Sequence, residues 1–489
     1  MKQDNKFNML SFTGKMKILH LSWMAFFITF VVWFNHAPLL GLIAKSLNIS
    51  MAEVKTLLIL NVALTIPARI IIGMLTDKFG PRLTYSFLLF AGSIPCFWFA
   101  FATDFAQLAM ARLLLGFVGA GFVIGIRMVS EWFPANELGI AEGIYGGWGN
   151  FGSAAAAILL PTIALFFGGD DGWRYAVGFS GLICLAFSFV WYTNVTDSPK
   201  GSTYFKSKKM GGLEVTSKGD FFFLLLMKLP MYIALVLVTW KLSPHGVALI
   251  SDSMAFGVYV VLAAILVYDC FCVYKVNKEI FHTPVPEIQR YQFKQVAAVN
   301  VLYFTTFGSE LAVVSMLPMF FADVYKLDMV YAGLVGSLFA IMNLIARPYG
   351  GWLSDHFGRK KTLMFVIAGL AAGYCAMSMI TSAWPLFFAV LVVMTCSFCV
   401  QAGCGAVFAV VPLIKRRLTG QIAGMTGAYG NTGGVFFLTV LSFVDYSTFF
   451  MVIAATAILG IIAIRFMNEP RGHMAEINDD GSVELIKVG

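Results

Sequence analysis

Two arginines lie inside strongly apolar stretches, at equivalent positions of a duplicated segment. Arg69 opens RIIIGMLTDKFGPR and Arg347 opens RPYGGWLSDHFGRK, with a glycine, an aspartate and a phenylalanine kept in register. A guanidinium at the middle of a bilayer is energetically costly, so it usually faces a partner or a wet cavity. Its planar fork matches a small planar anion better than a lysine does. The pair therefore predicts an anion held between two related halves.

The composition is that of a membrane protein. Of 489 residues, 59% are apolar and only 12% are charged. Apolar stretches of about 20 residues, the length that crosses a bilayer, recur along the chain, and we predict fourteen of them as helices. Most of the 34 Lys and Arg residues fall on one side of these spans, which predicts that both termini are cytoplasmic. The same asymmetry argues against nucleic acid as the reason for the net charge of +8.

The internal repeat divides the chain into two six-helix bundles with two extra helices between them. We predict an N-terminal bundle (1–193), a cytoplasmic linker (194–219), an extra transmembrane pair (220–274), a second cytoplasmic linker (275–293), a C-terminal bundle (294–468) and a cytoplasmic tail (469–489). Two repeated halves with a site at their interface are typical of alternating-access carriers. The extra pair is expected to pack peripherally, and the polar tail is expected to be disordered. Lys228, in the first extra helix, has no evident partner in the sequence.

The duplicated arginine segments end in charged loops that suggest a gate. The loops carry Asp77 with Arg82 and Asp355 with Arg359, and resemble the loop signature of the major facilitator superfamily. An aspartate there can cap a helix end and pair with basic groups, closing the cytoplasmic face until the carrier opens. The plainer reading is a charged tight turn. Arg112, on the fourth helix, also matches a superfamily pattern and is expected to be structural or gating.

Two glycine-rich segments carry a narrower resemblance. GGWGNFG (146–152) and GAYGNTGG (427–434) resemble the nitrate signatures of the nitrate/nitrite porter family. Their glycines, including Gly149 and Gly430, would let backbone approach a very small ligand. Asn150 and Asn431 would offer amide donors from opposite sides. Ordinary close packing of small residues is the alternative for either segment alone.

The resemblance also implies roles for individual residues. In that family two intramembrane arginines, one per half, clamp the anion, and the matching residues here are Arg69 and Arg347. Tyr303 and Phe307 match positions where family members place a phenol and a ring against the substrate. They share one helix face with Glu310, an acid that the family's proton-coupled branch carries.

Glu310 raises the question of coupling. A carboxylate beside two guanidiniums would balance the charge of the empty site and bind a proton once an anion takes its place. Anion and proton would then bind together. The alternatives are that Glu310 only pairs with an arginine, or lies near the outer mouth.

We therefore predict a secondary active transporter of nitrate, nitrite or both, in the cytoplasmic (inner) membrane. It would work by alternating access and couple nitrate uptake to protons. A nitrate/nitrite antiporter and a carrier of another small monovalent anion are the alternatives. The sequence contains no catalytic constellation, no metal-binding constellation and no phosphate-binding loop. The eight cysteines have no histidine or acidic residue near them at the spacing of a metal site. No enzyme activity, cofactor or obligate protein partner is expected.

Overall fold

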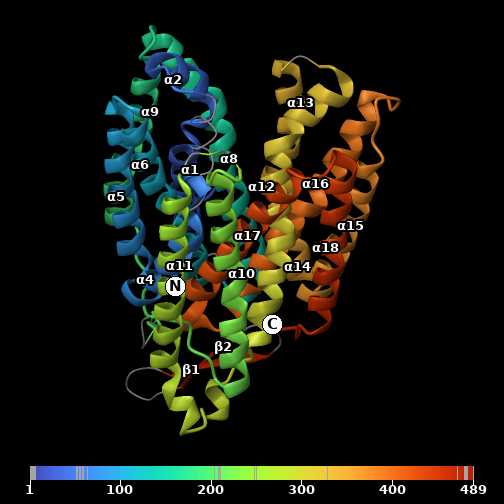
Figure 1. Ribbon diagram of the computed structural model, residues 1–489. Coiled ribbons are helices and arrows are strands. Elements are labelled where there is room, and N and C mark those ends of the chain that lie inside the picture. The colour runs from blue at the N-terminus through green and yellow to red at the C-terminus, as the bar shows by residue number, and fades with distance from the viewer. Residues whose placement is uncertain are drawn as a thin grey trace.

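The computed structural model is almost entirely helical (Figure 1). It describes residues 7–487 except 51–52, 54–56, 58–59, 63, 203, 208–210, 247, 249, 328, 471 and 478–482. Parts of the predicted second helix, the first linker and the tail thus lie outside the described residues. Within the described chain, 13 helices are long and apolar enough to cross a membrane. The fourteenth predicted crossing is α17, which is not among these 13 helices and contains several glycines and threonines and an asparagine.

The N-terminal bundle holds α1 to α9. Its elements are α1 (Gly14–Phe34), η1 (Ala37–Leu39), α2 (Leu40–Leu47), α4 (Thr65–Phe79), α5 (Pro81–Phe101), α6 (Phe105–Leu115), η2 (Gly116–Ala120), α7 (Gly121–Trp132), α8 (Ala135–Phe167) and α9 (Gly172–Asn194). A cluster of buried apolar side chains joins α1, α5, α6 and α9 into one core. Asp104 begins α6 by accepting a hydrogen bond from the Gln107 amide at 2.9 Å.

The C-terminal bundle repeats this arrangement. It contains α12 (Phe293–Tyr325), α13 (Met329–Ile341), α14 (Asn343–Phe357), α15 (Arg359–Ser378), α16 (Leu386–Phe408), η5 (Val411–Leu413), η6 (Arg416–Leu418), α17 (Thr419–Leu441) and α18 (Tyr446–Arg465). In both halves the charged loop turns through a glycine of positive φ, Gly80 at 88° and Gly358 at 98°. This conformation is accessible to glycine without strain, which explains why the loop motif keeps glycine there.

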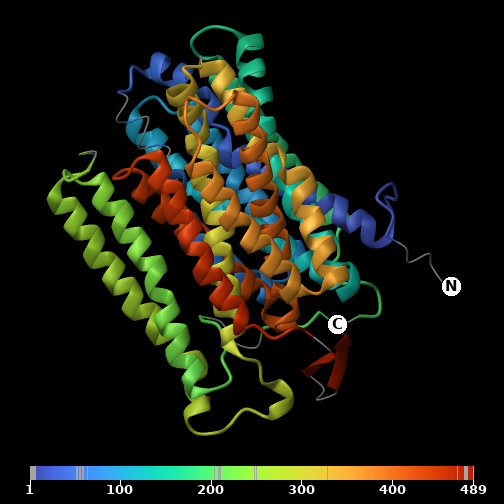
Figure 2. The same ribbon diagram turned by 90° about the vertical axis from the view of Figure 1, so that its right-hand side faces the viewer.

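The extra helices α10 (Lys218–Leu242) and α11 (Asp252–Asn277) lie together on one side of the molecule (Figure 2). Short 3-10 turns η3 (Lys278–Phe281) and η4 (Glu287–Gln289) lead on to α12. Only α10 packs closely on the C-terminal bundle, against α17 and α12. Lys228, which has no evident partner in the sequence, pairs with Asp269 of α11 at 2.7 Å, and Tyr232 donates to the same carboxylate at 3.2 Å. This ion pair ties the two extra helices together.

The expectation of a disordered tail was wrong. β1 (His473–Ile477) and β2 (Val483–Lys487) form an antiparallel pair in which His473 lies opposite Lys487. The second strand, VELIK, contains the apolar residues Val483, Leu485 and Ile486, which favour a strand. The overall polarity of the tail concealed this short apolar segment.

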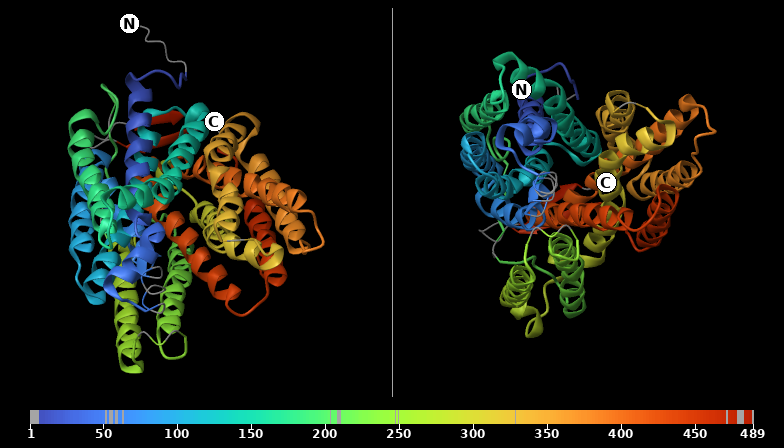
Figure 3. Two further views of the ribbon diagram at one scale, coloured as in Figure 1. Left: turned by 90° about the horizontal axis from the view of Figure 1, so that it is seen from above. Right: turned by 45° about the horizontal axis from the view of Figure 1, so that its top comes forward.

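The two bundles meet at the end where both termini lie and diverge at the other end (Figures 1 and 3). At the closed end, α4 packs on α17 and α8 packs on α14, so the second helix of each half meets the fifth helix of the other. A methyl group on Gly73 would lie 2.2 Å from the Gly420 carbonyl oxygen, and one on Gly351 would lie 1.8 Å from that of Gly139. The repeated glycines are therefore needed where the halves touch.

Candidate anion site and cytoplasmic gate

Arg69 and Arg347 are both buried at the interface of the halves, with only 1% and 2% of their surface exposed. Each reaches the fifth helix of the opposite half. Arg69 Nη1 donates to the Gly427 carbonyl at 2.7 Å, and Arg347 Nη1 lies 3.4 Å from the Gly146 carbonyl, the equivalent position of the repeat. Neither Nε atom has a hydrogen-bond partner among the described residues. Each guanidinium therefore keeps a free donor.

Aromatic rings from both halves surround the guanidiniums. The Phe307 ring centroid lies 5.2 Å from the Arg69 guanidinium carbon and 5.6 Å from that of Arg347. Phe307 stacks on Tyr303 at 5.0 Å, and Phe122 of the other half lies parallel to Tyr303 at 6.4 Å. Such faces attract cations and exclude water. The two guanidiniums, one from each half, thus lie against the same phenylalanine ring.

The two signature asparagines are placed differently from each other. With its amide oriented to turn the oxygen towards Arg347, Asn150 accepts from Nη1 at 2.6 Å and from Nη2 at 3.1 Å. Asn150 thus holds Arg347. Asn431 is fully buried, and neither its oxygen nor its nitrogen has a partner among the described residues. An unpaired buried amide is costly, so Asn431 is the one of the two that is free to bind a ligand.

The predicted glycines contact rings rather than open space. A methyl group on Gly149 would overlap Phe26 at 1.8 Å, and one on Gly430 would lie 2.7 Å from both Phe307 and Tyr303. Other glycines of these segments contact the opposite half, as Gly147 and Gly427 do. The packing role that the sequence left as an alternative therefore accounts for several of these glycines.

Glu310 connects the arginine pair to a cavity on the open side. One carboxylate oxygen accepts from Arg347 Nη2 at 2.9 Å and the other accepts from the Asn343 amide at 2.7 Å. Glu310, Phe307, Asn150 and Asn343 line a cavity of about 350 Å³. The remaining lining comes from the open ends of α1, α8, α12 and α13. The carboxylate therefore lies between this cavity and the buried arginine.

The acid at position 310 has no counterpart in the first half. Gly152 packs on the Phe27 carbonyl of α1, and Gly433 packs on the Phe304 carbonyl of α12 in the same way. These matching contacts align the sequence of α1 with that of α12, its equivalent in the second half. In this register Trp33 corresponds to Glu310. The Trp33 indole donates to the Asn61 carbonyl at 3.0 Å within its own half. The site thus has two cations but only one carboxylate.

The aspartates of the two loops bind the opposite halves at the closed end. Asp77 accepts from the amides of Gly420 and Gln421, both at 2.8 Å, near the start of α17. Asp355 accepts from the amides of Gly139 and Ile140 at 3.0 and 2.9 Å in α8. A carboxylate that accepts from two backbone amides in the first turns of a helix is stabilised by charge-assisted hydrogen bonding and by the helix dipole. These two contacts join the halves symmetrically.

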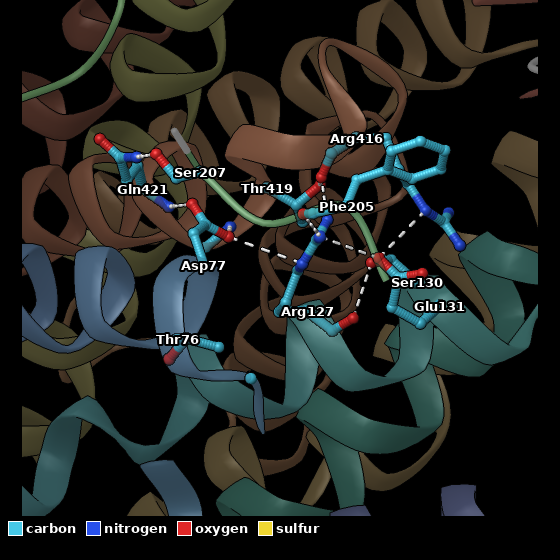
Figure 4. Close-up of polar contacts among 12 residues, drawn as sticks. Thr76, Asp77, Arg127, Ser130, Glu131, Phe205, Ser207, Arg416, Thr419 and Gln421 are labelled. Atoms are coloured by element: carbon cyan, nitrogen blue, oxygen red, sulfur yellow. Dashed lines mark hydrogen bonds and ion pairs between the residues drawn. The ribbon is translucent and has the colours of Figure 1, made fainter. Parts of the chain in front are cut away.

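The arginine that accompanies each aspartate comes from a different place in each half. Arg359 donates to Asp355 and to the Ala135 carbonyl. Its counterpart in the repeat is Pro81, which has no such side chain. In the first half Arg127 of α7 accompanies the aspartate instead, at 3.5 Å from Asp77 (Figure 4). Arg127 also donates to the Arg416 carbonyl, and Arg416 is the residue of the second half that corresponds to Ala135.

Arg127 was not among the residues predicted to act as a gate. It lies in an apolar span, and Glu131 follows it at i+4 and pairs with it at 3.0 Å. Glu131 also lies 3.4 Å from the Arg416 guanidinium. An arginine with an acid one turn later in an apolar helix was the signal that could have identified it.

The first linker contributes to this cluster through residues 204–207, here called the strap. Arg127 donates to the Phe205 carbonyl at 2.8 Å and to the Tyr204 hydroxyl at 3.3 Å, while Tyr204 donates to the Thr76 carbonyl at 2.7 Å. Ser207 accepts from the Gln421 side chain of the opposite half at 3.2 Å (Figure 4). Burial raises the pKa of the Tyr204 phenol, so it stays a neutral donor. The strap therefore bridges both halves at the closed end of the interface.

Two residues predicted to act as gates make their contacts within one half. The Arg82 guanidinium donates to the Tyr192 carbonyl at 2.8 Å and lies over the Tyr192 ring. The backbone amide of Arg82 donates to Asp197. Arg112 is fully buried and donates to Asn35 at 2.9 Å and to Asn61 at 2.6 and 3.0 Å. Neither makes a contact across the halves within the described chain. Arg112 has the bonding of a structural residue.

Comparison with known proteins agrees with this architecture. Residues 22–275 and 299–485 match the family model of the Major Facilitator Superfamily. The crystal structure of the human organic anion transporter MFSD10 superposes with a TM-score of 0.63 at 11% identity, covering 92% of this chain and all of that one. At that identity the likeness shows the fold alone. It confirms the predicted all-α membrane fold.

Relatives in sequence narrow the class. The chain is 44% identical to the nitrate/nitrite transporter NrtP of Nostoc punctiforme, over 96% of this chain and 95% of the relative. It is 43% identical to the protein of the same name from a Picosynechococcus species, over 98% and 97%. The chain therefore belongs to the Major Facilitator Superfamily and, within it, to the family of these nitrate/nitrite transporters. It is a multi-pass membrane transporter.

Proposed function

We propose that the protein carries nitrate and nitrite across the cytoplasmic membrane by alternating access, with the anion held between Arg69 and Arg347. The observation that carries the proposal is the buried arginine pair, one from each half. Both Nε donors and the Asn431 amide on the adjoining helix lack a hydrogen-bond partner among the residues that the structure describes. The names of the relatives support the choice of anion. In this conformation the site connects to the side opposite the termini, which is the outside if both termini are cytoplasmic.

The anion would bridge the halves and drive their movement. Nitrate and nitrite are small, planar and weakly hydrated, so two guanidinium forks can bind their oxygens in place of water. Tyr303 and Phe307 would orient the ion, and Asn431 would donate to it. With the anion bound, the two charges no longer repel each other, and the halves can close over the site. A lysine would keep the charge but lose the coplanar donors.

Glu310 would couple the movement to protons. In the empty site its carboxylate neutralises Arg347. An arriving anion competes for the same guanidinium, and a displaced carboxylate without its cation binds a proton from the outer cavity. Release of the anion inside restores the ion pair and frees the proton. One proton and one anion would thus cross in the same direction.

The anion clamp is tested by binding and uptake in the purified protein. Arg69→Lys and Arg347→Lys should each weaken nitrate binding by about tenfold to a hundredfold, the effect expected from losing one charge-assisted hydrogen bond. Arg82→Lys is the matched control, because its guanidinium stays within one half on the cytoplasmic side. Full nitrate affinity in both site variants would contradict the clamp.

Coupling is tested in liposomes. Proton symport predicts nitrate uptake driven by an imposed pH gradient with no internal anion, and loss of that drive in Glu310→Gln. Strict dependence on internal nitrite would instead support exchange. Inhibition by formate or chlorate, compared with longer carboxylates, would show whether the carrier accepts other small monovalent anions.

A further inference from the structure

The closed end of the interface contains a carboxyl group that neither the anion site nor the gate uses. Glu142 of α8 is only 2% exposed, and neither of its carboxyl oxygens has a hydrogen-bond partner among the described residues. It lies between two contacts with the opposite half. Asp355 binds the Gly139 amide on its cytoplasmic side, and Arg347 approaches the Gly146 carbonyl on the other.

The cations around this part of α8 are already paired. The charged and titratable groups on the surrounding elements are Arg416 of η6, Arg127 and Glu131 of α7, Arg347 and Asp355 of α14, Arg359 of α15, and Tyr145 of α8 itself. Glu131 lies within 3.4 Å of both Arg127 and Arg416, Asp355 pairs with Arg359, and Glu310 pairs with Arg347. An ionised Glu142 would therefore be a buried charge that could only share Arg416 with Glu131, which proteins avoid by keeping the proton.

The repeat shows that the fold does not require an acid here. Gly139 and Gly143 correspond to Gly420 and Gly424, and Glu142 corresponds to Ala423. A polar group that is costly to bury and absent from the equivalent position is a candidate for function. This position also changes environment in transport, because Gly143 lies against the Arg347 and Pro348 backbone of the other half.

We propose that Glu142 is a second proton-binding residue of the transport cycle, protonated while the cytoplasmic gate is closed and exposed to the cytoplasm when it opens. The inference rests on alternating access in the proposed function. When α8 separates from α14, water reaches the carboxyl, and a hydrated glutamate with a pKa of about 4.3 releases its proton at neutral pH. Closing the gate binds one proton from the cytoplasm again. The cytoplasmic pH would thus set how readily the empty carrier returns outward.

The test follows the gate as a function of pH. Spin labels at the exposed Lys78 of α4 and Lys361 of α15 report the distance between the cytoplasmic ends of the halves. The measurement is made without anion on purified protein carrying Glu310→Gln, which removes the carboxyl group of the anion site. Asp77 and Asp355 stay in the parent and in its derivative, so they contribute equally to both pH slopes. If opening releases one proton from Glu142, the open-to-closed ratio of this parent should rise by up to about tenfold for each unit of rising pH. The Glu142→Gln derivative should lack this contribution to the pH slope. An unchanged slope in Glu142→Gln overturns the proposal.

Control variants distinguish the loss of the pH slope from misfolding of the protein and from a failure of the proposed nitrate transport. Glu137→Gln, on the same helix but paired with Lys15 at 2.5 Å, should keep the parent's pH slope. Glu142→Ala, which copies the equivalent position of the repeat, should behave as Glu142→Gln does. At neutral pH the parent should show an infrared carbonyl band of a protonated carboxyl that Glu142→Gln lacks, and absence of that band also overturns the proposal. Because no anion is present, failure of nitrate transport would leave these readings intact.

Discussion

Replacement of Asp77 by asparagine should open the closed end of the interface, which we propose is the cytoplasmic gate. The carboxylate accepts from the Gly420 and Gln421 amides, both at 2.8 Å, and faces Arg127 at 3.5 Å. Asparagine keeps one acceptor, turns an NH₂ group towards the second amide, and removes the charge. A hydrogen bond to a charged group contributes about 1.5–3 kcal/mol, and relief from burying the carboxylate offsets part of its loss. We expect a net cost of about 2 kcal/mol to the closed state, or about thirtyfold in the open-to-closed ratio.

The distance between labels at Lys78 and Lys361 measures this shift directly. Asp77→Asn should add a longer distance population that the parent protein lacks. Asp104→Asn is the matched control, because this aspartate also caps a helix through one amide but lies away from the interface of the halves. A distance distribution identical in Asp77→Asn and Asp104→Asn would refute the assignment of Asp77 to the gate.

Three further outcomes follow from contacts that the sequence did not reveal. Arg127→Lys should destabilise the closed state relative to the open state by about 1–3 kcal/mol in the same label assay. Lysine has a single ammonium group and cannot bind the strap and the opposite half at the same time. An unchanged distance distribution in this variant would contradict that role. Tyr204→Phe should have a smaller effect of about 1 kcal/mol, and a faster exchange of the neighbouring amides with deuterium would show the strap loosening. Lys228→Met should lower thermal stability by leaving the Asp269 carboxylate without its counter-charge, and adding Asp269→Asn should restore most of the loss. Equal melting temperatures of the single and double variants would argue against the pair.

The general architecture could be predicted because its signals are local and repeated. Apolar spans of bilayer length give helices in any context, and the segments that begin at Arg69 and Arg347 have the same register in both halves. Equivalent sequence in equivalent helices puts the two side chains at equivalent depths. The family assignment, the all-α membrane fold and transport of nitrate follow from such signals, and the comparisons support them. The roles of the individual site residues remain predictions.

The sequence determined which residues are equivalent, but only the tertiary structure decided which partners they have. Asn150 and Asn431 occupy the same position of the repeat, yet Asn150 holds Arg347 and Asn431 has no hydrogen-bond partner among the described residues. Arg127 replaces the side chain that Pro81 cannot supply. A repeat fixes the position of a residue on its helix, whereas its contacts depend on the opposite half, where the two copies have diverged. A buried polar group finds its partner across that interface, and no local pattern records the choice.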